Sequence, residues 1–124
     1  MKAVILNREE NAASMLKRQI MMLGSAHETV IFPNPDNVLQ HLERNRINAV
    51  FFDIDGETDW QSVCEMVKYM DESIKLVLMS RNPLNAVKAF EAGASDFLPK
   101  PVERERLAKT IDRFVETDDA QTYL

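Results

Sequence analysis

The chain has 124 residues, of which 45% are hydrophobic and 28% are charged, and its net charge at pH 7 is −5. This length suits one domain with a packed core, and the excess of acidic residues argues against a face that binds nucleic acid. The single cysteine, Cys64, cannot form an internal disulfide, and no apolar stretch reaches the ~20 residues of a membrane span, so we expect a soluble cytoplasmic protein.

Short apolar runs alternate along the chain with stretches in which apolar residues recur every three or four positions. In chain order these patterns predict a strand at residues 3–6, a helix at 12–23, a strand at 29–32, a helix at 38–42, a strand at 49–52, a helix at 63–70, a strand at 76–79, a helix at 84–90, a strand at 96–98 and a helix at 107–115. Five β-α units with almost wholly apolar inner strands predict an α/β fold. We expect a (βα)5, doubly wound, open parallel sheet of five strands in a flavodoxin-like three-layer sandwich. We interpret the methionine and phenylalanine side chains of these stretches as core residues.

Polar residues follow four of the five predicted strands. In an open parallel sheet, functional residues gather at the carboxyl ends of the strands. Asp53 follows the third strand, Ser80 the fourth and Lys100 the fifth, while residues 7–10 follow the first. A carboxylate, a hydroxyl and an ammonium group at one edge suit phosphoryl transfer to a carboxylate. Asp53 would attack the phosphorus, and the other two groups would stabilise charge on the phosphoryl oxygens.

These strand-end residues resemble those of the response regulator receiver (CheY-like) domains of bacterial two-component systems, over essentially the whole chain. The resemblance rests on Asp53, on Ser80 and on the sequence of residues 96–101. It implies that a histidine kinase phosphorylates Asp53, that Ser80 and Phe97 are the pair that moves, and that Lys100 binds the phosphoryl group ahead of a cis peptide bond to proline. Such a domain would accept and hydrolyse its own aspartyl phosphate and would not be a turnover enzyme.

The chain departs from the receiver pattern at the end of the first strand. Receivers usually carry two acidic residues there, which hold Mg²⁺, and this chain has Asn7 and Arg8 instead. Arginine cannot bind a cation. The resemblance therefore implies a weakened Mg²⁺ site built from Asp53, the backbone carbonyl of Asp55, and Asn7 or Glu9.

The same departure supports an alternative function. Arg8 or Arg81 could supply the missing positive charge by pairing directly with Asp53. The domain would then be a pseudo-receiver, an interaction or dimerisation module that works without phosphorylation.

Residues 51–56, a strand followed by Asp-x-Asp-Gly, also resemble the first motif of haloacid-dehalogenase-type phosphatases. There Asp53 would be the nucleophile and Asp55 a general acid/base. Two β-α units precede the motif and no metal-binding Gly-Asp motif follows it, so this alternative is distant. In a receiver, a carboxylate at Asp55 could affect hydrolysis of the aspartyl phosphate.

Further features concern partners. Residues 86–94 are similar to receivers that precede a LytTR-type DNA-binding domain, which implies an output domain outside this chain and a role in transcription regulation. Charges on the fourth helix, fifth strand and fifth helix suit a symmetric homodimer through that face. These residues are Lys88, Glu91, Asp96, Glu103, Arg104, Arg106 and Arg113. We expect a receiver domain at residues 1–116 and a C-terminal tail or start of a linker at residues 117–124.

Overall fold

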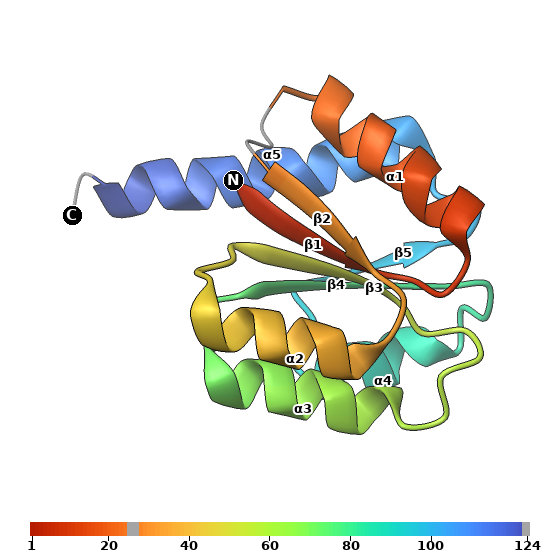
Figure 1. Ribbon diagram of the computed structural model, residues 1–124. Coiled ribbons are helices and arrows are strands. Elements are labelled where there is room, and N and C mark those ends of the chain that lie inside the picture. Colours follow the sequence, from red (N-terminus) through yellow and green to blue (C-terminus); the bar gives the residue numbers. More distant parts are fainter. Residues whose placement is uncertain (25–27, 123–124) are drawn as a thin grey trace.

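The computed structural model describes residues 1–24 and 28–122, with side chains described through residue 114. In this part of the chain, five strands alternate with five helices, as the sequence predicts (Figure 1). The strands are β1 (Lys2–Leu6), β2 (Glu28–Phe32), β3 (Ala49–Asp53), β4 (Lys75–Ser80) and β5 (Asp96–Pro99). The helices are α1 (Glu10–Met22), α2 (Pro35–Arg44), α3 (Trp60–Met70), α4 (Asn85–Glu91) and α5 (Arg104–Thr122).

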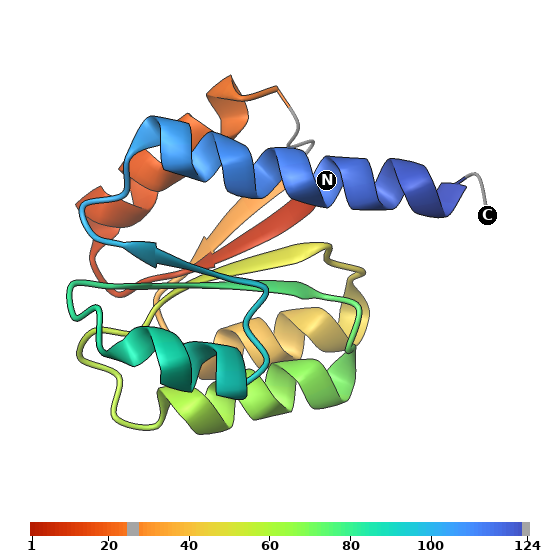
Figure 2. The same ribbon diagram turned by 180° about the vertical axis from the view of Figure 1, so that it is seen from behind.

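The strands form one parallel sheet in the order β2-β1-β3-β4-β5. Helices α1 and α5 cover one face of the sheet, and α2, α3 and α4 cover the other (Figures 1 and 2). Alternate residues of β3 enter the two cores because successive side chains of a strand point to opposite faces. Val50 and Phe52 pack in the core under α2, α3 and α4, whereas Phe51 packs in the core under α1 and α5. This confirms the predicted doubly wound α/β sandwich.

The strand order places Asp53 at the point where the direction of winding reverses. The chain passes from β1 outward to β2 and then returns to β3 on the other side of β1. Such a reversal opens a crevice at the carboxyl ends of the neighbouring strands. Leu6 of β1 pairs with Phe52, and Ser80 of β4 pairs with Pro99 of β5, so the carboxyl ends meet at one edge, on the right of Figure 1.

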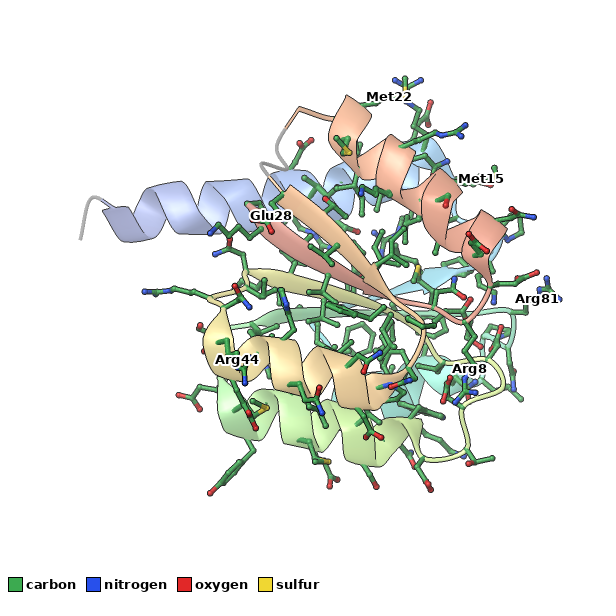
Figure 3. All side chains as sticks on the ribbon, in the orientation of Figure 1. Arg8, Met15, Met22, Glu28, Arg44 and Arg81 are labelled. Atoms are coloured by element: carbon green, nitrogen blue, oxygen red, sulfur yellow. The ribbon has the colours of Figure 1, made fainter. Side chains whose placement is uncertain are left out.

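The prediction that all methionine and phenylalanine residues of the helices are core residues is wrong. Met15 is 62% exposed and Phe90 is 52% exposed. Met15 and Met22 project away from α1 in Figure 3. Further exposed apolar residues are Met21, Met66, Tyr69, Met70 and Val87 on the helices and Leu84 directly before α4.

Helix α4 shows the physical reason most clearly. Its buried residue is Ala89, and Ala86 and Ala92 pack beside it against the core. Small side chains let this short helix lie close to the sheet, so the larger Val87 and Phe90 are turned to solvent. The larger apolar residues whose spacing predicts this helix therefore lie on its exposed face.

Three of the charges that the sequence assigned to a dimer face bind each other within the chain. Asp96, at the start of β5, is 4% exposed and accepts hydrogen bonds from Arg106 Nη2 at 2.6 Å and from Thr110 Oγ1 at 2.6 Å. Arg113 also pairs with this carboxylate. Burial alone would raise the pKa of Asp96, but the hydrogen bonds from Arg106, Thr110 and the Phe97 N–H outweigh it and lower the pKa. These contacts connect α5 to the first residue of β5, the edge strand of the sheet.

Helix α5 continues to Thr122, past the boundary that the sequence suggested at residue 116. Residues 117–122 contain no glycine or proline, so nothing in them breaks a helix. Residues 123–124 of the expected tail lie outside the described residues, and the division into domain and linker stays a prediction. Within the part of the chain that the structure describes, no helix is long and apolar enough to cross a membrane.

Candidate functional site

The carboxylate of Asp53 is held at the end of β3 by the loop that follows it. Asp53 is 8% exposed, and its Oδ1 accepts a hydrogen bond from the Asp55 N–H at 3.0 Å. The loop then turns through Gly56, whose φ of +80° is a conformation that glycine adopts without strain. The Glu57 N–H closes this turn on the Ile54 carbonyl at 3.1 Å. The local sequence therefore fixes the orientation of the carboxylate before any partner binds.

Lys100 lies between two carboxylates at this edge. Its Nζ is 2.6 Å from Asp53 Oδ2 and 3.0 Å from Asp55 Oδ2. The peptide bond to Pro101 is cis. Burial alone would lower the pKa of Lys100, but hydrogen bonds and charge from the two carboxylates outweigh it and raise the pKa. Lys100 is therefore a permanent positive charge beside Asp53.

Ser80, the last residue of β4, is fully buried, and its hydroxyl makes three hydrogen bonds. Its Oγ donates to Asp55 Oδ1 at 2.6 Å. It accepts hydrogen bonds from the Asn82 N–H at 3.0 Å and from Asn85 Nδ2 at 3.2 Å. The hydroxyl thus reaches the edge where the sequence predicts it, but it binds Asp55 rather than Asp53.

The hydrogen bonds of the Asp55 carboxylate are the part of the site that the sequence did not predict. For a receiver, the sequence implied a metal-ligand role for the Asp55 backbone carbonyl and an effect of its carboxylate on hydrolysis of the aspartyl phosphate. Its carboxylate accepts hydrogen bonds from Ser80 Oγ, from the Arg81 N–H at 2.9 Å and from Lys100 Nζ. Burial alone would raise the pKa of Asp55, but these hydrogen bonds outweigh it and lower the pKa, so the group is ionised at neutral pH. The Asp-x-Asp spacing placed Asp55 on the loop but gave no sign of where its side chain points.

Phe97 lies on the sheet strand next to Ser80 and faces inward. It is 8% exposed and packs in the core under α2, α3 and α4. The register pairs it with Leu78, two residues before Ser80. The structure therefore combines a buried Phe97 ring with a Ser80 hydroxyl that is hydrogen-bonded at the site.

The side chains around Asp53 do not fit a Mg²⁺ ion as they are arranged. Asn7 turns its Nδ2 donor to Asp53 Oδ2, at 3.4 Å, and its Oδ1 accepts the Glu9 N–H at 2.8 Å. Asp53 Oδ2 is already bound by Lys100. A cation of this kind needs several oxygen ligands. Among the described residues, no three His, Cys, Asp or Glu residues lie where they could hold a metal together.

The positive charge beside Asp53 does not come from an arginine. The Arg8 guanidinium pairs with the Glu57 carboxylate instead, and this pairing raises the pKa of Arg8. Arg81 contributes its backbone N–H, which donates to Asp55. Arg8 and Arg81 both lie near the carboxyl edge in Figure 3. Within the described contacts, Lys100 is the cation that pairs with Asp53.

Restoring two carboxylates at the end of β1 should create a Mg²⁺ site. We expect the double variant Asn7→Asp with Arg8→Asp to bind Mg²⁺ measurably in a calorimetric titration under conditions in which the native chain does not. The double variant Asn45→Asp with Arg44→Asp makes the same change of charge at the end of α2 and is the control. Equal Mg²⁺ affinity of the native chain and the site variant would show that Asn7 and Arg8 have not weakened the site.

The site opens to solvent through a hollow of about 280 Å³. Its lining includes Asn7, Arg8, Asp53, Asp55, Arg81 and Lys100. The hollow brings a nucleophilic carboxylate, an ammonium group and backbone donors within reach of an incoming group. This is the arrangement that the transfer of a phosphoryl group to Asp53 would need.

Comparison with known proteins gives one consistent result. The profile of the family described as "Response regulator receiver domain" matches residues 4–112. The chain is 26% identical to "Sensory transduction protein LytR" of Staphylococcus epidermidis, over 91% of this chain and 45% of that protein. It is 24% identical to "Transcriptional regulatory protein LytR" of Staphylococcus aureus, over 91% of this chain and 46% of that protein. The chain thus spans about half the length of the curated relatives it matches.

A solved structure shows the same fold. The receiver domain of NtrX from Brucella abortus superposes with a TM-score of 0.83 at 26% identity, covering 94% of this chain and 99% of that one. Both the sequence and the fold of this chain are therefore similar to those of receiver domains along most of its length.

Proposed function

The chain belongs to the response regulator receiver domain family, and from this membership we propose that it is a signalling switch in which a histidine kinase phosphorylates Asp53. Receiver domains are signalling proteins rather than turnover enzymes. The observation that carries the proposal is the contact of Asp53 Oδ2 with Lys100 Nζ at 2.6 Å, at the edge of the open hollow. The ammonium group is placed to neutralise charge on a phosphoryl group joined to Asp53.

Phosphoryl transfer from the kinase to Asp53 exchanges one bond to phosphorus for another. An oxygen of Asp53 forms a bond to phosphorus as the P–N bond of the kinase phosphohistidine breaks, and the imidazole nitrogen keeps the electron pair and takes a proton. Water later attacks the phosphorus, inorganic phosphate leaves and the Asp53 carboxylate is restored. Receiver domains generally bind Mg²⁺ at acidic residues. Because the residues here do not fit that ion well, we assign charge stabilisation in this chain to Lys100 and the backbone donors.

The phosphatase alternative is set aside. A general acid must carry a proton, whereas the Asp55 carboxylate has a lowered pKa and is bound by Ser80 and Lys100.

The output is proposed from the relatives. One of them is named as a transcriptional regulatory protein, and the chain covers 46% of that relative. We infer that this domain acts in the cytoplasm and controls a DNA-binding output domain outside the present chain. The net charge of −5 of this chain disfavours its own contact with DNA, so we assign DNA binding to the output domain. The exposed Val87 and Phe90 on α4, with Leu84 directly before it, support a homodimer through the α4-β5-α5 face.

A second function, that of a pseudo-receiver, is favoured by one observation. Asn7 presents an amide donor to Asp53 where receivers usually present acidic residues for a cation. In that case the α4-β5-α5 face would bind its partner without phosphorylation of Asp53.

Intact mass spectrometry after incubation with acetyl phosphate tests the proposal. We expect the native chain to gain the mass of one phosphoryl group, the Asp53→Asn variant to gain none, and Asp112→Asn, an exposed carboxylate on α5, to behave as the native chain. Parallel samples with and without Mg²⁺ measure how far the adduct depends on the ion. If the native chain is folded by circular dichroism yet forms no adduct under any condition, the pseudo-receiver function replaces the proposed one.

A further inference from the structure

The Asp55 carboxylate, on the loop after β3, has three hydrogen-bond donors around it. Oδ1 accepts from Ser80 Oγ at 2.6 Å, and Oδ2 accepts from the Arg81 N–H at 2.9 Å. Lys100 Nζ is 3.0 Å from Oδ2. A hydroxyl, a backbone N–H and an ammonium group from the ends of β4 and β5 thus converge on one anion.

These donors border the place where a phosphoryl group on Asp53 would lie. Lys100 Nζ contacts Asp53 and Asp55 at once, so the two carboxylates are adjacent across one ammonium group. β3 and β4 are neighbours in the sheet, and Asp53 pairs with Met79, the residue before Ser80. Phosphoryl oxygens attached to Asp53 would extend into the hollow beside these donors and would need them. The Asp55 carboxylate already takes them.

We propose that the Asp55 carboxylate is an internal substitute for the phosphoryl group, which holds Ser80 and Phe97 in their site-facing and buried positions while Asp53 is unmodified. This inference rests on the proposed function, because it concerns the same site. Ser80 is fully buried with its hydroxyl on Asp55, and Phe97 is 8% exposed. Phosphorylation then displaces Asp55 from its donors instead of drawing Ser80 inward.

Asp55 can leave this position without unfolding the site. Its side chain is 32% exposed, which is far more than the 8% of Asp53. The flanking turn at Gly56 is formed by backbone contacts that do not involve the Asp55 carboxylate. The native chain is therefore expected to accept a phosphoryl group slowly, because transfer requires the release of three hydrogen bonds and brings two anions together.

The experiment compares Asp55→Ala and Asp55→Asn with Asp59→Asn, a control that neutralises an exposed carboxylate of the same loop whose side chain makes no capping hydrogen bond to α3. The first measurement is the rate at which acetyl phosphate modifies each protein, by intact mass. We expect Asp55→Ala to react about tenfold faster than the native chain or more, the effect expected for the loss of one charge-assisted hydrogen bond. Asp55→Asn should lie between them, and Asp59→Asn should match the native chain.

The second measurement does not need phosphorylation. Amide resonances of Arg81 and Phe97 are recorded by NMR for each unmodified protein. We expect them to shift in Asp55→Ala but not in Asp59→Asn, and to return toward their native positions when Asp55→Ala is phosphorylated. Retained dispersion of the spectrum shows that each variant is folded.

The two measurements separate the possible failures. If Asp55→Ala reacts at the native rate and its Arg81 and Phe97 resonances stay in place, the inference is overturned, while the phosphorylation of Asp53 stands. If no protein forms an adduct, the proposed function fails, and the resonances alone decide the inference: a shift in Asp55→Ala supports it and unchanged positions refute it.

Discussion

Replacing Lys100 by methionine is expected to slow phosphoryl transfer to Asp53 by about 100-fold or more, the usual cost of removing one group that stabilises developing charge. Lys100 Nζ is 2.6 Å from Asp53 Oδ2 and is itself largely buried. Methionine keeps most of the length of the side chain but leaves the phosphoryl oxygens without their cation. The rate of adduct formation from acetyl phosphate, measured by intact mass, gives the ratio.

The same variant should change how the site titrates. Hydrogen bonding and charge from Lys100 are among the causes that lower the pKa of Asp55. Without the ammonium group, the pKa of Asp55 in the folded variant is higher than in the native chain. As the pH falls, the native chain should therefore lose more stability than the variant, and as the pH rises again the native chain should recover that difference. Denaturation midpoints in urea at several pH values measure this effect.

Two matched variants test whether the positive charge of Lys100 is what sets the transfer rate. Lys109→Met removes a charge from the exposed side of α5 and should leave the transfer rate unchanged. Lys100→Arg retains the charge with a different shape, and partial recovery of the rate is expected. A native rate in Lys100→Met would mean that the backbone donors, and not the ammonium group, stabilise the phosphoryl oxygens.

The sequence predicted where Asp53, Ser80 and Lys100 lie, because their positions depend only on where the strands of the sheet end. The run of residues 49–53 is apolar until its last residue, which marks where the strand leaves the core. The same rule placed Ser80 and Lys100, because the carboxyl ends of parallel strands meet at one edge. These predictions needed only the positions at which the strands end.

The contacts within the loops could not be predicted in this way. Whether Asp55 turns toward Ser80 or toward solvent depends on the loop conformation, and no periodic pattern describes it. Arg8 could reach Asp53 or Glu57 from the same position, and the choice of Glu57 appears only in three dimensions. The contacts of loop side chains such as Asp55 and Arg8 are therefore the part that the sequence leaves open.

The helices show a different limit, because composition alone does not tell which face is buried. Phe51 and Phe90 were both predicted to be core residues, yet Phe51 is fully buried in β3 and Phe90 is 52% exposed on α4. A central strand of a parallel sheet has helices on both sides, so every position of β3 is buried. A short outer helix has one buried stripe, and on α4 alanines form it.

This contrast predicts the largest difference in stability between two chemically identical substitutions. Phe51→Ala is expected to lower the free energy of unfolding by about 3–5 kcal/mol, because it removes a ring from a filled core and leaves a cavity. Phe90→Ala should lower it by less than about 1 kcal/mol, as a surface substitution does. Urea denaturation followed by circular dichroism, with the midpoints and slopes of both variants compared with the native chain, measures the difference.

The outcome for Phe90 also bears on function. If Phe90→Ala leaves stability unchanged, the exposed ring does not contribute to folding and is available for contacts made through α4. If Phe90→Ala instead destabilises the chain as strongly as Phe51→Ala, the ring is buried in the protein in solution. The α4 face would then have fewer apolar side chains to offer a partner, and the proposed homodimer would lose its main support.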